Sequence, residues 1–282
     1  MSDPKNQHSV PQFLLERFAD NDGYLHVFDK RHRNSGIWKR KPRGVFVEKD
    51  LYTQIESDGT KDASVEKEFL STIEAKASPV VEKIVCTARR ADPLSLTPEE
   101  KDIWLRFLYC QFIRVPETRD KHTGDIRREV LNEISILGQL GLFHDYELSI
   151  LHDKRTMERL WRNASIKSVT TMHGEWFDIL SKKRMCVAVV RNPKSKRGFV
   201  IGRNPVLKLT YPGRAHLADP SVELWLALAR DVAVTPCPGE SDKIISIREN
   251  HVASINRKVF EQSDAIAGCS PKLIQSVLEK EE

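Results

Sequence analysis

A chain of 282 residues is long enough to bury a substantial core, and its 40% hydrophobic and 30% charged residues are typical of a globular protein in water. No apolar run approaches the ~20 residues that a membrane helix requires, and the polar first residues lack a signal-peptide core, so we expect a cytoplasmic protein with no membrane partner. The net charge of +5 permits binding to nucleic acid or another phosphate-bearing ligand without demanding it.

Residues 8–30 have the clearest local pattern near the N-terminus. Pro11 fits the first turn of a helix, where its missing N–H is not needed, and Ser9 could cap that helix. Apolar side chains recur at four-residue spacing over residues 10–18, which indicates one buried helical face. Residues 24–28 then alternate as in a strand with one buried face. The stretch therefore predicts a helix, a turn and a strand in close succession.

The middle third of the chain is expected to be mostly helical. Ser64 begins a helix with acidic residues in its first turn. Thr97 and Pro98 form a stronger helix start, with Thr97 as the cap and Pro98 at the first helical position, and this helix stops at Pro116. Three more helices are expected over residues 120–140, 146–161 and 166–180.

After residue 184 the helical spacing gives way to extended segments. Residues 185–190 are apolar and β-branched, residues 192–195 form a turn, and residues 198–201 complete an expected hairpin. A closing helix is expected over residues 250–267, with a short one after Pro271. Further strands are expected over residues 206–209, 222–234 and 244–247.

This order of elements predicts an α+β fold in a single domain spanning residues 1–282. We expect an N-terminal helix–strand segment, a central antiparallel helical layer at about residues 64–183, and mostly antiparallel C-terminal strands with a closing helix. Pairing of the N-terminal strands with the C-terminal ones would bring His8 near Asn204. The strand-rich parts are expected at about residues 20–55 and 185–248.

The N-terminal pattern HSVPQFLLERFA (residues 8–19), followed by GYLHVFDK (residues 23–30), resembles the opening of the family known as domain of unknown function 4238. That family is widespread in bacteria and fungi, and the resemblance supplies no activity. The similarity extends over nearly the whole chain. Glu66, Glu68 and Glu74 resemble the acidic helix of the family, and Gln111-x-x-Arg114-x-Pro116-x-x-Arg119 resembles its glutamine–arginine–proline helix end.

One segment departs from the family pattern. Residues 199–206, FVIGRNPV, resemble a strand and turn that usually ends in Ser-Asp-Asn-Pro, and here Gly202 and Arg203 replace the serine and the aspartate. If that aspartate serves the family as a base or a metal ligand, this chain lacks it and carries a cation instead. The resemblance therefore implies affinity for an anionic group more than inherited catalysis.

Missing motifs exclude several common enzyme classes. The sequence has no G-x-x-x-x-G-K-[ST], G-x-G-x-x-G, H-E-x-x-H or G-x-S-x-G motif. Residues 173–175 and 236–237 match part of the zinc deaminase signature, but its second cysteine is missing. The five cysteines are scattered without a C-x-x-C pair, which predicts neither a disulfide framework nor a thiolate zinc site. The triplet Glu74-Ala75-Lys76 has the E-x-K form that nucleases use on a strand, but it lies in an expected helix and is interpreted as a surface ion pair.

A set of polar residues remains that the fold could bring together. A neutral His8 could transfer a proton, Glu74 could orient it, and Arg114 could clamp a phosphate bidentately, so these three are the candidate catalytic residues. His8 lies just before a helix N-terminus, which favours its neutral form. No metal-ligand set is found, and the cofactor is unknown. The candidate substrate-binding residues are Gln12, Gln111, Arg119, Arg203 and Asn204.

Two functions fit this set. The first is a hydrolase acting on a phosphate-bearing substrate such as nucleic acid, in a defence or stress role suggested by the family's scattered occurrence. The second is a non-catalytic binding or interaction protein in which the same residues form a structural buried network. The first predicts that His8 and Arg114 converge in an open pocket, whereas the second predicts that they are covered or paired only with backbone.

Overall fold

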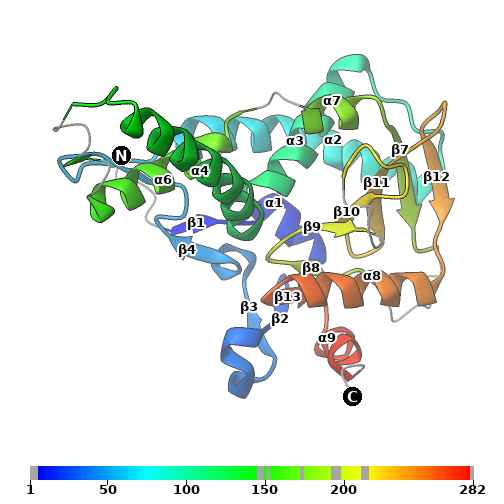
Figure 1. Cartoon of the computed structure of the whole chain (residues 1–282). Coiled ribbons are helices and arrows are strands. Elements are labelled where there is room, and N and C mark those ends of the chain that lie inside the picture. The colour runs from blue at the N-terminus through cyan, green and yellow to red at the C-terminus, as the bar shows by residue number, and fades with distance from the viewer. Residues whose placement is uncertain are drawn as a thin grey trace.

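The computed structural model describes residues 6–144, 149–150, 153–171, 175–191, 198–210 and 216–279. Within this part of the chain, helices and largely antiparallel sheets form the α+β fold that the order of elements predicts. Figure 1 shows the central helices between a helical pair at one end of the molecule and a five-stranded sheet at the other.

The N-terminal helix is shorter than its apolar pattern suggests, with one α-helical turn that continues as a 3-10 turn. Ser9 does not cap it, because the residues before it form a strand that pairs with a later strand. The Ser9 hydroxyl instead donates to the carbonyl oxygens of Phe46 and Arg203. The elements here are β1 (Asn6–His8), α1 (Gln12–Leu15), η1 (Glu16–Phe18), β2 (Leu25–Asp29), η2 (Lys30–Ser35), β3 (Trp38–Arg40), η3 (Pro42–Gly44), β4 (Val47–Lys49), β5 (Gln54–Ile55) and β6 (Lys61–Asp62).

The helix start at Thr97 is confirmed in detail. The Thr97 hydroxyl accepts from the Glu100 N–H at 3.1 Å, and the Glu100 carboxylate accepts from the Thr97 N–H at 2.7 Å, which completes a capping box. The helix expected from residue 120 begins earlier, with Pro116 in its first turn. The helices are the π-helical turn η4 (Val65–Leu70), α2 (Ser71–Arg90), α3 (Pro98–Ile113), α4 (Pro116–Gln139), α6 (Lys154–Ser168) and α7 (Glu175–Ser181).

The C-terminal part forms two sheets instead of a simple meander. The expected hairpin of residues 185–190 and 198–201 is wrong, because the first strand pairs with later strands on both sides. The turn expected at residues 192–195 lies outside the described residues. The elements are β7 (Arg184–Val189), β8 (Ile201–Gly202), β9 (Val206–Leu209), β10 (Glu223–Ala229), β11 (Val232–Cys237), β12 (Lys243–Ser246), α8 (Glu249–Gln262), β13 (Ala265–Gly268) and α9 (Pro271–Leu278).

Strand β13 joins the two ends of the chain. The sequence pattern placed its residues in a closing helix, but α8 ends at Gln262 and β13 pairs antiparallel with β2 on one side and with β8 on the other. The four-stranded order is β3-β2-β13-β8, and the five-stranded order is β12-β7-β11-β10-β9, with β12 parallel to β7. An N-terminal strand therefore does pair with a C-terminal one, but the partner is β13, whose residues were expected to be helical, and not one of the expected strands.

A large hydrophobic cluster extends in sequence from Val10 to Ala267, and a smaller one lies where α8 and α9 pack against β13 and its neighbours. The single-domain organisation remains a prediction, which one cooperative unfolding transition would support. None of the described helices combines the length and the apolar character needed to cross a membrane.

Candidate functional site

Arg114 connects three segments that are far apart in the sequence. It is the C-cap of α3, and its side chain is fully buried. Nη1 donates to Glu74 Oε1 at 2.6 Å, and Nε donates to the Tyr52 hydroxyl at 3.0 Å. Nη2 donates to the backbone carbonyl oxygen of His8. Because charge-assisted hydrogen bonds are strong, this guanidinium fixes β1, α2 and the segment after β4 around α3.

His8 therefore meets Arg114 through its backbone and not through its imidazole. The side chain is partly buried, and Nε2 has no hydrogen-bond partner within the described residues. Burial lowers the pKa of His8, although hydrogen bonding to the Arg43 backbone and the charge of Glu74 oppose it. The lowered pKa favours the neutral imidazole near pH 7, and burial is its largest cause.

Glu66 lies close enough to Arg114 and Glu74 to feel their charges, although the sequence-based set leaves it out. It lies in the π-helical turn before α2, and burial raises its pKa to about 7, with the charge of Glu74 adding to the rise and Arg114 opposing it. Its Oε2 is buried without a hydrogen-bond partner in the described part of the chain. Glu74 is instead paired with the buried Arg114. The interpretation of the Glu74-Ala75-Lys76 triplet as a surface ion pair is therefore wrong. Two neighbouring carboxyl groups thus differ in environment, a pattern seen where enzymes use an acid and a base.

The three glutamines near the N-terminal segment have different environments. Gln111 is fully buried one turn before Arg114, and neither its Oε1 nor its Nε2 has a partner within the described residues. Gln12, predicted to bind substrate, is exposed and donates to Glu16 at 2.9 Å, away from the buried network. Gln7 was not predicted, yet it is buried and accepts from the Tyr52 N–H at 2.6 Å. Only burial, which the sequence does not specify, separates these cases.

Arg119 faces a second polar environment, close to the buried network. Together with Arg127, Trp161 and Arg162 it lines a cavity of about 380 Å³ between α4 and α6, which we call the arginine pocket. The positive charge of Arg119 influences both Tyr52 and Arg162, so the pocket and the buried network are neighbours. Arg114 and Arg119 are thus both close enough to Tyr52 to influence its ionisation.

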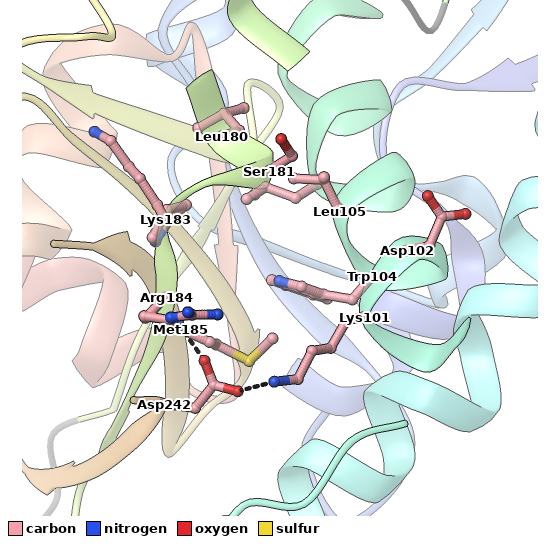
Figure 2. Close-up of a pocket in the computed structure, with 12 residues that line it drawn as sticks. Lys101, Asp102, Trp104, Leu105, Leu180, Ser181, Lys183, Arg184, Met185 and Asp242 are labelled. Atoms are coloured by element: carbon pink, nitrogen blue, oxygen red, sulfur yellow. Dashed lines mark hydrogen bonds and ion pairs between the residues drawn. The ribbon is translucent and has the colours of Figure 1, made fainter. Parts of the chain in front are cut away.

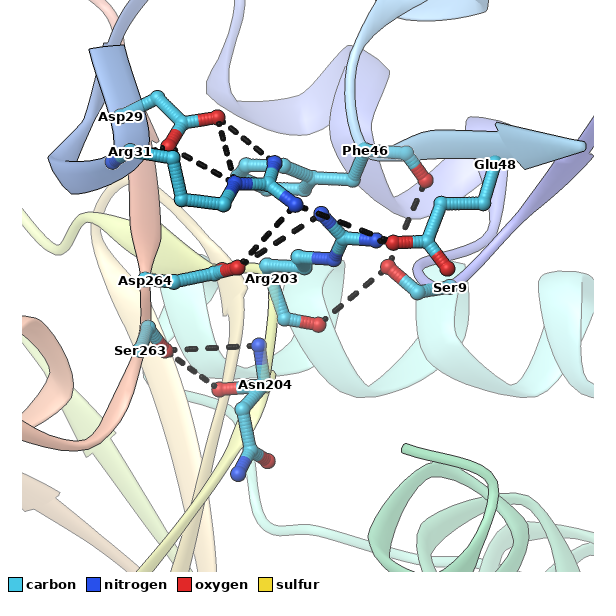
Figure 3. Close-up of polar contacts among 9 residues, drawn as sticks. All are labelled: Ser9, Asp29, Arg31, Phe46, Glu48, Arg203, Asn204, Ser263 and Asp264. Carbon is cyan, nitrogen blue, oxygen red and sulfur yellow. Dashed lines mark hydrogen bonds and ion pairs between the residues drawn. The ribbon is translucent and has the colours of Figure 1, made fainter. Parts of the chain in front are cut away.

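Arg203 belongs to a separate ion-pair cluster, drawn in Figure 3. It is buried, contacts the Glu48 carboxylate, and lies 3.7 Å from Asp264, which also receives Arg31 at 3.3 Å. Two arginines and their carboxylates therefore tie β4, η2 and the start of β13 together, and the fold does not bring Arg203 to Arg114. The cation that replaces the family's aspartate has carboxylate partners of its own.

Asn204 lies beside this cluster but directs its side chain away from it, as Figure 3 shows. Its backbone N–H and carbonyl bond to the Ser263 hydroxyl, and its Oδ1 is buried without a partner in the described chain. The Ser9 hydroxyl donates to the Arg203 carbonyl at 3.3 Å, so the segments carrying His8 and Asn204 do meet. They meet where the Ser9 side chain contacts the Arg203 backbone, and the His8 and Asn204 side chains take no part in that contact.

Gly202 leaves room for the Ser263 side chain. We therefore expect any side chain at position 202 to lower the stability of the protein. A Cβ on Gly202 would overlap the Ser263 hydroxyl and lie 3.0 Å from the Asn204 carbonyl oxygen. We expect Gly202→Ala to lower the free energy of unfolding by about 1–3 kcal/mol in urea denaturation. Adding Ser263→Gly should recover part of that loss, and a single variant as stable as the wild type would contradict the crowding.

Comparison with known proteins identifies a family but no activity. A family model described as "Protein of unknown function (DUF4238)" matches residues 6–267. No curated protein and no solved structure matches the chain. No set of three His, Cys, Asp or Glu residues in the described ranges is arranged to hold a metal ion, and His173 lies outside those ranges. The match covers most of the sequence, and the chain therefore belongs to the DUF4238 family.

Proposed function

We propose that this chain binds a phosphate-bearing ligand, with nucleic acid as the class to test first, in the arginine pocket. The carrying observation is the environment of Arg162. Its Nη1 and Nη2 donate to the carbonyl oxygens of Thr53 and Asp50 at 2.5 and 2.8 Å, which carry no formal charge. Burial and the nearby charge of Arg119 both lower the pKa of Arg162, and the negative charge of Asp50 offsets them only in part. An anion between these guanidinium groups would relieve that repulsion.

Trp161 gives the pocket a second means of recognition. The Arg127 guanidinium carbon lies 5.7 Å from the centre of the Trp161 ring, so a cation and an aromatic face adjoin. Phosphates pair with arginine forks, and bases stack on aromatic rings with little sequence preference. These features favour a nucleotide or a single strand over inorganic phosphate.

A hydrolytic activity on that ligand is our second proposal, and the Glu66 carboxyl favours it. A group with a pKa of about 7 exists in both protonation states at neutral pH, which suits general acid–base catalysis. In this proposal Glu66 and the neutral His8 transfer protons as water displaces the leaving oxygen from phosphorus. Glu74 and Arg114 are positioning residues. We place this activity in the cytoplasm, where free thiols such as those of the described cysteines persist, and assign it to defence or stress.

The non-catalytic alternative is favoured by Arg114 itself. Its side chain is fully buried, and its hydrogen bonds go to Glu74, Tyr52 and the His8 backbone. The function of such a network can be purely structural, namely to hold three segments together. If so, the chain binds its ligand without transforming it.

Binding is tested by fluorescence polarisation with labelled single-stranded RNA and DNA over a range of salt concentrations. Arg127→Gln should weaken binding about tenfold and reduce the salt dependence by about one phosphate contact, with little change in Tm because Arg127 is exposed. Arg128→Gln, an equal change of charge on the next exposed residue, is the matched control. Binding that is insensitive to both Arg127 and salt would refute the arginine pocket.

Hydrolysis is tested by following cleavage of the same oligonucleotides. Glu66→Gln should abolish cleavage while binding persists, whereas Glu68→Gln, an exposed neighbour, should leave cleavage unchanged. Binding without any cleavage by the wild-type protein would establish the non-catalytic alternative.

A further inference from the structure

A cavity of about 220 Å³ lies on a different part of the molecule, where the start of α3 faces the end of α7 and the first residues of β7. We call it the α3–β7 cavity, and Figure 2 shows its lining. It shares no lining residue with the arginine pocket or the buried network. Its volume is below the ~300 Å³ lower end for drug-sized ligands, so it suits a small molecule and not an oligonucleotide or a peptide.

Apolar residues make up half of the lining of this cavity. Trp104 presents its indole ring, and that side chain is only 5% exposed, so the ring forms a fixed surface. The Trp104 indole N–H has no hydrogen-bond partner among the residues described, and Figure 2 shows this edge turned toward Arg184. A ligand with an apolar body would therefore gain contact area without displacing a protein hydrogen bond. The remaining apolar lining comes from Leu105, Leu108, Leu180, Met185 and Pro236.

One cation at the cavity is not matched by a contacting carboxylate. Asp242 accepts from Lys101 at 2.8 Å and from the Met185 N–H at 2.9 Å, so these partners hold both of its oxygens. The Arg184 guanidinium makes no hydrogen bond or ion pair within the described ranges, although its charge helps to lower the pKa of Asp242. Figure 2 shows it extending over the cavity. Asp102, the other acidic residue of the lining, pairs with Arg106 at 2.7 Å.

The Lys183 ammonium group does not compete for the same ligand. Its stem lines the cavity, but Nζ points away in Figure 2 and is 3.5 Å from the Val222 carbonyl oxygen. The cavity thus offers one guanidinium, one indole N–H and an apolar wall. A single negative charge fits this set better than a phosphate dianion, because each further charge brought against the apolar wall must be desolvated.

We propose that the α3–β7 cavity binds a small monocarboxylic acid with an aromatic or branched aliphatic body. The carboxylate pairs bidentately with Arg184, one of its oxygens accepts from the Trp104 indole N–H, and the apolar body packs against the leucines of α3 and α7. In this proposal Arg184 makes the site prefer a negatively charged ligand, and the fixed Trp104 ring limits the shape of the ligand that fits.

The test is isothermal titration calorimetry of the full chain with 3-phenylpropionate and, as a neutral ligand of nearly the same shape, 3-phenylpropionamide. We expect saturable binding of the acid and at least ~tenfold weaker binding of the amide. Arg184→Gln should weaken acid binding by at least ~tenfold, whereas Lys182→Gln, the same change of charge on an exposed neighbour outside the cavity, should leave it unchanged.

Equal affinity for acid and amide, no effect of Arg184→Gln, or tighter binding of inorganic phosphate than of the acid would each overturn the proposal. A second variant checks the position of the ligand: Leu105→Trp fills the cavity from a partly exposed position and should abolish binding while the Tm is kept. Retained binding in that variant would also refute the site. Because oligonucleotide binding depends on other residues, it should be the same in Arg184→Gln as in the wild type.

Discussion

Arg114→Met should lower the free energy of unfolding by about 3–5 kcal/mol, the usual cost of removing one partner of a buried ion pair. The change leaves the Glu74 carboxylate, 24% exposed, without its cation, and leaves the Tyr52 hydroxyl and the His8 carbonyl without their donor. Methionine fills much of the arginine's volume, so the loss reports the polar contacts more than a cavity. Urea denaturation at pH 7 measures it.

The matched control lies on the same helix. Arg106 pairs with Asp102 at 2.7 Å, but both side chains are exposed, so Arg106→Met should cost less than about 1 kcal/mol. Adding Glu74→Gln to Arg114→Met should recover part of the loss, because the neutral amide no longer needs a cation. If Arg114→Met costs no more than Arg106→Met, the buried network does not hold the fold together.

Glu66→Gln should remove a pH dependence from the stability of the protein. The folded-state pKa of Glu66 is raised from 4.5 to about 7, so between these values the folded state keeps a proton that the unfolded state has released. Stability from this group is therefore complete below pH 4.5 and is lost as the pH rises through 7. The pKa difference between 4.5 and about 7 corresponds to a change of roughly 3 kcal/mol in the free energy of unfolding.

We expect Glu66→Gln to be more stable than the wild type at pH 8 by an amount of that order, and about equal to it near pH 4.5. Denaturation curves at a series of pH values measure the difference. Glu68→Gln, two residues away and exposed, should change the pH dependence little. Parallel pH profiles for the wild type and Glu66→Gln would show that Glu66 ionises normally, which would also remove the main support for acid–base catalysis.

Local elements were predictable where neighbouring residues decide them. The capping box at Thr97 depends on residues within one turn, and the alternation in β2 depends on side chains within one strand. Strand β13 was missed because its residues Ala265–Gly268 are apolar and small and suit either a helix or a strand. Its pairing with β2, from the other end of the chain, makes it a strand.

The residues of the candidate site were likewise predictable only in part from the sequence. The sequence grouped Glu74 and Arg114, which do meet, and it named Arg119, which lines the neighbouring pocket. It also placed Gln12 in the site, although that side chain is exposed and donates to Glu16. Glu66 was left out because its unusual proton affinity comes from burial by other segments.

The amino-acid sequence by itself determined the α+β class, most helix starts, and a set of polar residues suited to an anionic ligand. It suggested that strands from the two ends of the chain pair, but not that the partner strand would be β13. The tertiary structure decided which of those polar groups are buried and which carboxyl keeps its proton. It also decided which arginines contact a carboxylate: Arg203 does, whereas Arg184 contacts none among the described residues. The reason is physical. Helix caps and strand alternation depend on residues a few positions apart, whereas desolvation and ion pairing depend on distances between segments that only the folded chain sets.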